Sequence, residues 1–254
     1  MRLHLLPLVL AAAGASWASP VEQRQAASST SASATATATP YDFREGAITQ
    51  YPIHSSCNVT LQRQLTRALT ETVELAKHAR DHILRFGQSS PFVQKYFGNG
   101  TTAVPLGWYT RVISADRGNM TFRCDDPDQN CKTQNGWAGH WRGSNATQET
   151  VICDLSFVRR RWLNSVCGLG YNVAESPLNT FWATDLLHRI FHVPQISEGV
   201  VDHFAEDYEQ VLELAKTDPA KSAIDSDTLQ YFAIDVYAYD IAAPGEGCSG
   251  GHSE

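Results

Sequence analysis

The chain has 254 residues and a formal net charge of −7, with 20 Lys and Arg against 27 Asp and Glu. The one basic cluster in the sequence is Arg159–Trp162. The acidic balance and the lack of a larger basic patch count against a nucleic-acid partner. No segment reaches the roughly 18 consecutive apolar residues that a membrane-spanning helix requires, so no membrane span is predicted.

Residues 1–18 have the pattern of a secretory signal peptide. Arg2 precedes an apolar run from Leu3 to Ala13, and small residues follow up to Ala18. This order of basic, apolar and small segments is typical of signal peptides, and the run is too short to span a membrane. We therefore predict a secreted, extracellular protein. Any association with the cell surface would not depend on a membrane-spanning helix.

Residues 19–40 are predicted to be a disordered tail or propeptide. Between Ala26 and Pro40 the segment contains only Ala, Ser, Thr and the closing Pro, so it has no large apolar side chain to bury. The remaining residues, 41–254, have the length of a single domain.

The first half of this domain is predicted to hold one long helix and two strands. Apolar residues recur at helical spacing from Leu61 to Phe86, which predicts an amphipathic helix that ends at Gly87. The stretches YTRVIS (109–114) and MTFRC (120–124) alternate like strands. Residues 125–147 are rich in Gly, Asn and Asp and are predicted to be loop.

Three helices are predicted in the second half. The first covers Thr180–His192 and is stopped by Pro194, and the second covers residues 201–216. The third covers Asp227–Ile241, with Asp227 as its N-cap. The predicted fold class is therefore α+β and mainly helical.

The cysteines and the N-x-[ST] sequons fit an extracellular compartment. An even number of cysteines in a secreted chain predicts three disulfides, although six cysteines allow fifteen connectivities. The sequons predict surface asparagines that are available for glycosylation. The cysteines are Cys57, Cys124, Cys131, Cys153, Cys167 and Cys248, and the sequons start at Asn58, Asn99, Asn119 and Asn145.

Two histidines in the stretch DLLHRIFHVP are candidate zinc ligands. His188 and His192 are four residues apart, so on a helix they lie on one face and both imidazoles can reach one metal ion. Zinc peptidases use the related pattern H-E-x-x-H, with Glu as general base. The alternative is two ordinary core histidines that are each satisfied by a hydrogen bond.

A third ligand is expected from the stretch VDHFAEDY (201–208). His203 follows His192 by eleven residues, which is enough for the chain to turn at Pro194 and return. Asp202 is the alternative ligand, and Glu206 or Asp207 offers a further carboxylate. The alternative for His203 is an exposed residue at a helix start, and for Asp202 an N-cap.

Two other histidine positions are weaker candidates. His78 and His82 have the same spacing but lie among charged residues, which favours a solvated helix face; a weak metal site would need Glu74 one turn earlier. His140 lies between Trp137 and Trp141, which predicts either a loop residue packed by aromatic rings or a cleft wall.

Several stretches together resemble the H-R-x-x-H family of fungal secreted antigens, which includes zincophore-type pH-regulated antigens and a mould major allergen. The resemblance extends from Tyr41 to Cys248 and implies kinship with the deuterolysin-type (aspzincin) peptidases. The stretches that carry it include YPIHSSCN, KHARDHILRFG, FRCDDPDQNC, GWAGHWRG, NTFWATDLLHR, VDHFAEDY and YAYDIAAPGEGC.

The resemblance implies a deuterolysin-like (zincin) metallopeptidase fold with disulfides Cys57–Cys124, Cys131–Cys153 and Cys167–Cys248. It implies that His188, His192 and His203 hold Zn²⁺, with Asp202 as the alternative third ligand. It also implies zinc scavenging, with host extracellular proteins or a cell-surface zinc transporter as partners.

The position of the peptidase Glu is occupied by Arg189. A guanidinium has no lone pair to accept a proton, so Arg189 cannot act as the general base. We therefore predict a zinc-binding protein on a degenerate peptidase fold, in which Arg189 forms a helical ion pair with Asp185 worth a few tenths of a kcal/mol. The alternatives are an active peptidase that uses another carboxylate, such as Glu206, and a surface antigen whose zinc is purely structural.

Overall fold

The longest element is helix α1 (Val59–Phe86), and its sequence explains both of its ends. In the computed structural model, which describes residues 40–249, the Asn58 side chain caps α1 by accepting hydrogen bonds from the backbone N–H groups of Thr60 and Leu61. The helix stops at Gly87, whose φ of 50° suits a residue without Cβ. The predicted helix is confirmed. The predicted signal peptide and tail, up to residue 39, lie outside the described residues.

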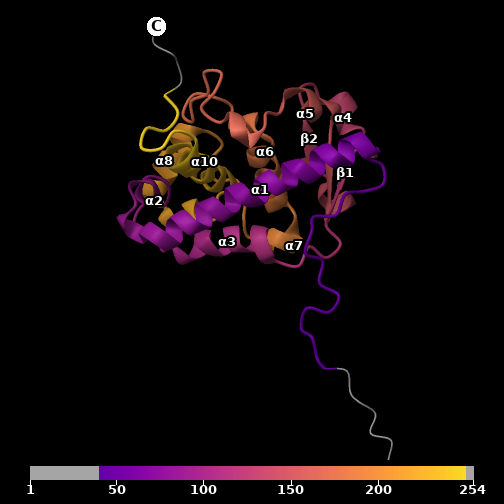
Figure 1. The fold of residues 1–254 in the computed structure, drawn as a ribbon, viewed down its shortest axis with the longest axis horizontal. Helices are drawn as coiled ribbons and strands as arrows, with labels where there is room; N and C mark the ends of the chain where they lie inside the picture. Colours follow the sequence, from indigo (N-terminus) through magenta and orange to yellow (C-terminus); the bar gives the residue numbers. More distant parts are fainter. Residues whose placement is uncertain (1–39, 250–254) are drawn as a thin grey trace, which may run out of the picture. The chain divides into compact units, whose positions relative to one another are not determined.

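Three helices pack against α1: α3 (Ala103–Ser114), α6 (Trp182–His192) and α10 (Ser226–Tyr237) (Figure 1). The strand predicted for YTRVIS is wrong, because these residues complete α3. The helix buries Pro105, Trp108, Tyr109 and Val112, which are spaced as one helical face. Over the six residues of YTRVIS alone, polar and apolar residues alternate as in a strand, and the helical spacing becomes visible only over the whole of α3.

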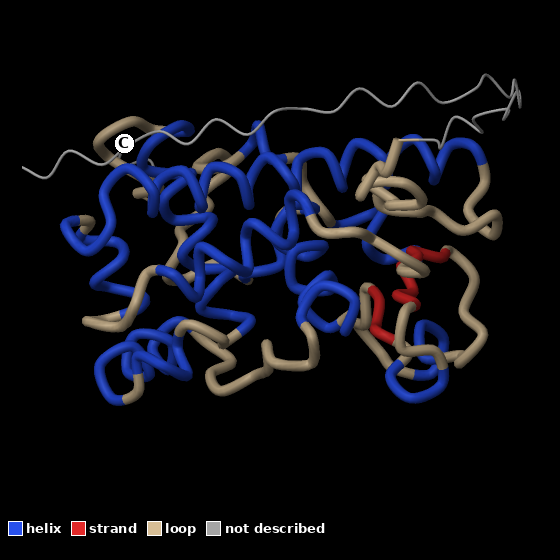
Figure 2. Tube along the Cα trace, turned by 90° about the horizontal axis from the view of Figure 1, so that it is seen from below, coloured by secondary structure: helices blue, strands red, loops and turns tan. Residues whose placement is uncertain are grey.

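A small sheet follows α3. Its strands are β1 (Thr121–Arg123), β2 (Gly139–Trp141) and β3 (Glu149–Ile152), in the order β1-β3-β2, with β1 parallel and β2 antiparallel to β3. Figure 2 shows the strands together among the helices and loops. The strand in MTFRC is confirmed. The segment predicted to be entirely loop is wrong in part, since it contains β2 and the short helix α4 (Asn130–Thr133).

The second half confirms the helical prediction and corrects its boundaries. The helix predicted from residue 201 begins only at α8 (Tyr208–Thr217), with Asp207 as N-cap. The N-cap of α10 is Asp225 rather than Asp227, and a π-helical turn (Ala238–Ala242) follows the helix. The remaining α-helices of the described residues are α2 (Pro91–Phe97), α5 (Asp154–Arg159), α7 (Pro194–Ser197) and α9 (Pro219–Ser222).

Three disulfides pin the irregular segments. They join Cys57 to Cys124, Cys131 to Cys153 and Cys167 to Cys248, which are the pairs that the resemblance implies. The four sequon asparagines are all exposed, so each is accessible to a glycan. Within residues 40–249, no helix combines the length and apolar character needed to cross a membrane.

Candidate metal centre

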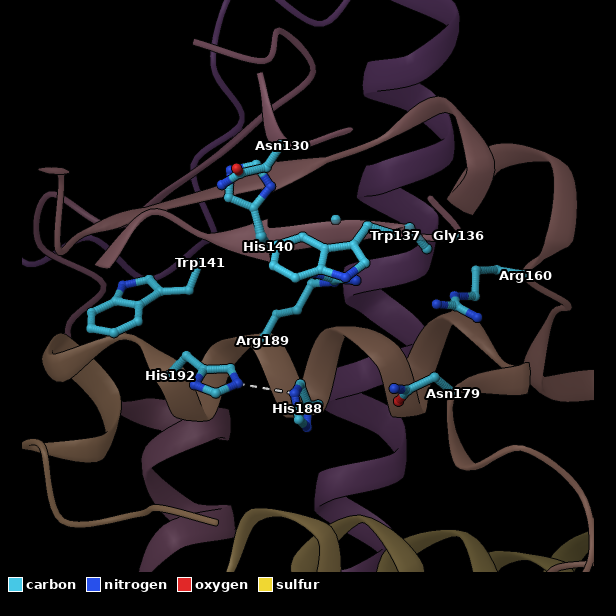
Figure 3. A pocket seen from close by; sticks show the side chains of 12 residues that line it. Asn130, Gly136, Trp137, His140, Trp141, Arg160, Asn179, His188, Arg189 and His192 are labelled. Carbon is cyan, nitrogen blue, oxygen red and sulfur yellow. Dashed lines mark hydrogen bonds between the residues drawn. The ribbon is translucent and has the colours of Figure 1, made fainter. Parts of the chain in front are cut away.

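Helix α6 presents two of the three candidate ligands. The helix buries Leu186, Leu187, Ile190 and Phe191, and this apolar stripe fixes its rotation against the core. His188 and His192 lie outside that stripe and face the same side, with their Nε2 atoms 2.9 Å apart (Figure 3). The helix ends at His192, before Pro194 opens α7.

His203 reaches the same point from the extended segment between α7 and α8. This segment is held by a parallel bridge between Asp202 and Asp225. The buried Asp225 carboxylate also accepts hydrogen bonds from the backbone N–H groups of Phe204 (2.7 Å) and Ala205 (3.0 Å). The extended conformation, stabilised by Asp225, therefore directs His203 toward α6.

The three imidazoles converge with a spacing that suits a metal ion. Nε2 of His203 lies 3.3 Å from Nε2 of His192, which in turn lies 2.9 Å from Nε2 of His188. Two nitrogens bound tetrahedrally at 2.0–2.1 Å would be about 3.3 Å apart. The three ligand atoms all lie within 4.8 Å of one another. The residues present therefore fit a zinc ion with three nitrogen ligands.

Groups behind the imidazoles orient His188 for this role. Its Nδ1 lies 3.1 Å from Oε1 of Gln230, whose own amide nitrogen donates to Asn179 Oδ1 and to the carbonyl of Thr184. Since that arrangement makes Oε1 an acceptor, Nδ1 of His188 carries a proton and the neutral ring keeps its Nε2 lone pair for a metal.

Asp227 lies behind two of the three imidazoles. Its carboxylate is 3.4 Å from Nδ1 of His188 and 3.8 Å from Nδ1 of His203. Burial raises the pKa of Asp227, but hydrogen bonds and attraction from the two histidines outweigh this effect and lower the pKa to about 2. The group is therefore an anion that would partly balance the charge of a metal held by these histidines.

The pKa values of His192 and His203 are shifted in opposite directions. Burial, followed by repulsion from His188 and His203, lowers the pKa of His192 to about 3, so its ring is neutral at ordinary pH. The contact with Asp227 raises the pKa of His203, despite partial burial. His192 is also stacked on Trp141, with ring planes 8° apart.

The carboxylates considered beside His203 are engaged elsewhere or exposed. Asp202 is exposed, and its carboxylate accepts a hydrogen bond from the backbone N–H of His203. Asp207 caps α8, and Glu206 is exposed. Across residues 40–249, the cluster of ligand atoms at this site consists of the three histidines alone.

Arg189 belongs to a buried ion cluster. Its guanidinium donates two hydrogen bonds to Asp185, at 3.1 and 3.0 Å, and Arg160 donates a third at 3.0 Å. Burial raises the pKa of Asp185, but attraction to Arg189 and Arg160 outweighs burial and lowers it. The predicted ion pair is confirmed. The predicted few tenths of a kcal/mol is typical of exposed helical pairs, whereas Asp185 is fully buried and also pairs with Arg160.

A cleft of about 510 Å³ opens beside the histidines, between α6 and the segment around β2 (Figure 3). Trp137 and His140 line it, together with His188, Arg189 and His192. His140 is buried on β2, and burial lowers its pKa. Of the two predicted roles for His140, the cleft wall is confirmed.

The groups that support the site have no clear signature in the sequence. No motif marks Gln230 or Asp225, and the position of Asp227 predicts an N-cap rather than a partner of the histidines. The only signal was the density of short polar residues in AIDSDT (223–228), which is typical of a helix start and carries no indication of a metal.

The second histidine pair does not lie on a solvated face, so that prediction is wrong. His82 is buried, and both His78 and His82 contact Asp240, which is 158 residues or more away in the sequence. Helix α1 turns this face toward the segment after α10, a long-range contact that the local charges around the pair did not reveal.

The structural comparison shows the type of fold. A zinc peptidase from Grifola frondosa is similar over 70% of this chain and 97% of its own, with a TM-score of 0.51 and 17% identity. This likeness confirms the expected zinc-peptidase fold.

The sequence comparisons show the family. The model of "HRXXH: Putative peptidase family" matches residues 6–251. The major allergen Asp f 2 of Aspergillus fumigatus is 55% identical over 83% of this chain and 67% of its own length. Antigen 1 of Emericella nidulans is 48% identical over 99% of this chain and 85% of its own. The pH-regulated antigen PRA1 of Candida albicans is 51% identical over 83% of this chain and 70% of its own. The chain belongs to the HRXXH family.

Proposed function

We propose that this protein is a secreted zinc-binding protein that holds Zn²⁺ with His188, His192 and His203. The observation that carries the proposal is the convergence of the three Nε2 atoms, at separations of 2.9 and 3.3 Å, in front of Gln230 and Asp227. Neutral nitrogens at such distances repel one another through their lone pairs unless a proton or a cation lies between them. Partners that bring or receive zinc, such as host extracellular proteins or a cell-surface transporter, are part of the proposal.

The chemistry of the cleft favours binding over peptide hydrolysis. Zinc held by three histidines lowers the pKa of a bound water to about 7, but hydrolysis also needs a group that moves a proton. Of the described side chains, those that line the cleft include no carboxylate. Arg189, at the position of the general base, is held by Asp185. Hydrolysis that is lost in His192→Ala but retained in Arg189→Ala would favour a peptidase instead.

The test of this proposal separates His203 from its neighbour Asp202. Zinc titration of the full chain is expected to show an affinity at least about 100-fold lower in His203→Ala, since loss of a ligand exceeds the 10–100-fold typical of its supporting groups. Asp202→Asn is the matched control and is expected to bind zinc within about threefold of the wild type, because its carboxylate accepts a backbone hydrogen bond that the amide oxygen retains. If Asp202→Asn loses zinc affinity and His203→Ala keeps it, Asp202 is the third ligand. Unchanged affinity in both variants would refute the site.

Zinc affinity is expected to fall with pH below about 6.5, because metal-bound histidines must lose their protons. Asp227 raises the pKa of His203, so protons compete with zinc at this residue over the whole acidic range, whereas His192 stays neutral until about pH 3. Titrations at pH 7.5 and pH 5 are expected to differ by at least about tenfold in affinity. Equal affinities would exclude a site made only of histidines.

A further inference from the structure

A second group of metal-ligating side chains lies where α1 meets the π-helical turn after α10. His78 and His82 project from one face of α1, one turn apart, and both contact Oδ2 of Asp240. The distances from Oδ2 are 2.9 Å to Nε2 of His78 and 2.6 Å to Nδ1 of His82. We propose that these three residues form a second site for a divalent transition metal of the zinc class.

The donor set and its exposure fit such an ion. Two imidazoles and one carboxylate are a ligand combination that zinc uses when a fourth position is left for water. The three ligand atoms lie within 4.8 Å of one another. The side chains of His78 and Asp240 are 21% and 23% exposed, so solvent can supply the fourth ligand. The separations of 2.9 and 2.6 Å must widen by about 0.4 and 0.7 Å to reach the roughly 3.3 Å between tetrahedral ligands.

The inner ligand, His82, is already oriented by its surroundings. Its Nε2 lies 2.7 Å from Oγ of Ser90, a buried residue that caps α2. Edge contacts with Phe92 and Phe232 hold the ring plane. The 2.6 Å separation from Asp240 is that of a hydrogen bond that Nδ1 donates. A bound metal would replace this proton while Nε2 donates to Ser90, which is the arrangement of a metal ligand backed by a second hydrogen-bond partner.

The backbone that carries Asp240 is a second, independent observation. Helix α10 does not continue in α-helical form but ends in the π-helical turn Ala238–Ala242, closed by the hydrogen bond from Ala243 N–H to the carbonyl of Ala238. Single π-helical turns are rare and are frequently found at functional sites. Here the wide turn presents the carboxylate to both imidazoles.

The two sites are separate. Asp227 supports the first site at the start of α10, and Asp240 belongs to the second just beyond its end. Asp240 follows Asp227 by 13 positions, which correspond to about 20 Å along a helix axis. At that distance the sites share no ligand or supporting group, so two equivalents of metal are expected per chain.

The test is a titration of metal-free, full-length protein with Zn²⁺ at pH 7.5, which gives the number of ions bound per chain. Co²⁺ serves as a spectroscopic probe of the same sites. Wild type is expected to bind two equivalents, and Asp240→Asn and His78→Gln one each. Asp81→Asn is the matched control: it removes an exposed carboxylate from the same turn of α1, where Asp81 pairs with Arg80, and the variant is expected to bind two.

The outcomes distinguish this site from the first. If His192→Ala also reduces the count to one, and His192→Ala with Asp240→Asn reduces it to none, both sites exist. A wild-type count of one that Asp240→Asn and His78→Gln leave unchanged overturns the second site and leaves the first intact. A count of one that is lost in Asp240→Asn and retained in His192→Ala overturns the first site instead. His78 is partly exposed, so His78→Gln provides a reading even if Asp240→Asn fails to fold.

Discussion

Zinc at one hundred times its dissociation constant is expected to raise the free energy of unfolding by about 2.7 kcal/mol, and His192→Ala is expected to abolish this gain. The gain arises because the three imidazoles are brought together only in the folded chain, by α6 and by the segment that Asp225 holds. His192 is the central ligand of the three, since its Nε2 contacts both of the others. Denaturant unfolding with and without zinc measures the effect.

The measurement is best made with His78→Gln present in both proteins, so that only the first site contributes. His54→Ala is the matched control, because His54 contacts Ser56 and belongs to neither histidine cluster. It is expected to retain the full gain. Zinc stabilisation that persists in His192→Ala would mean that the metal binds elsewhere, and no stabilisation in either protein would mean that the chain does not hold zinc at this site.

The helix that carries two of the candidate ligands could be predicted from the sequence because its signal is local. His188 and His192 are fixed by a spacing of four, and the apolar residues around them alone predict which face is buried. The support from Gln230 could not be predicted in the same way, since it depends on how α10 packs against α6.

The position of His203 shows where local rules fail. A helix is predicted from residue 201, but the residues before Tyr208 are not helical. Asp225, about twenty residues later, accepts the backbone hydrogen bonds of Phe204 and Ala205. The same limit applies to His82. Its charged neighbours predicted solvent exposure, and only the fold brings Asp240 to it.

The side chain that replaces the peptidase Glu has a structural role that the sequence suggested only in part. The pair of Arg189 with Asp185 follows from their spacing, but Arg160 comes from beyond the end of α5. Three charged groups thus meet in a buried place, and an isolated helix gives no indication of such a cluster. Arg189 therefore occupies the position of the peptidase Glu and also links α6 to Arg160 through their shared partner Asp185.

Asp185→Ala is expected to lower the free energy of unfolding by about 3 to 5 kcal/mol, because it leaves two guanidinium groups without their shared carboxylate in the protein interior. Asp185 is fully buried, and it accepts hydrogen bonds from both Arg189 and Arg160. Denaturant unfolding of the zinc-free protein, with disulfides intact, measures the loss without a contribution from the metal.

Two further variants test whether the loss of unfolding free energy in Asp185→Ala comes from unpaired buried charge. Asp81→Ala removes an exposed aspartate that also pairs with an arginine, and it is expected to cost less than about 1 kcal/mol. Replacing Asp185, Arg189 and Arg160 together by apolar residues is expected to recover most of the loss, since no buried charge then remains. If Asp185→Ala costs no more than Asp81→Ala, the cluster is not a source of stability. Zinc binding of the triple variant is a separate measurement. If the triple variant binds zinc, Arg189 is dispensable to the metal site. If it does not, the ion cluster positions α6 for its two histidines.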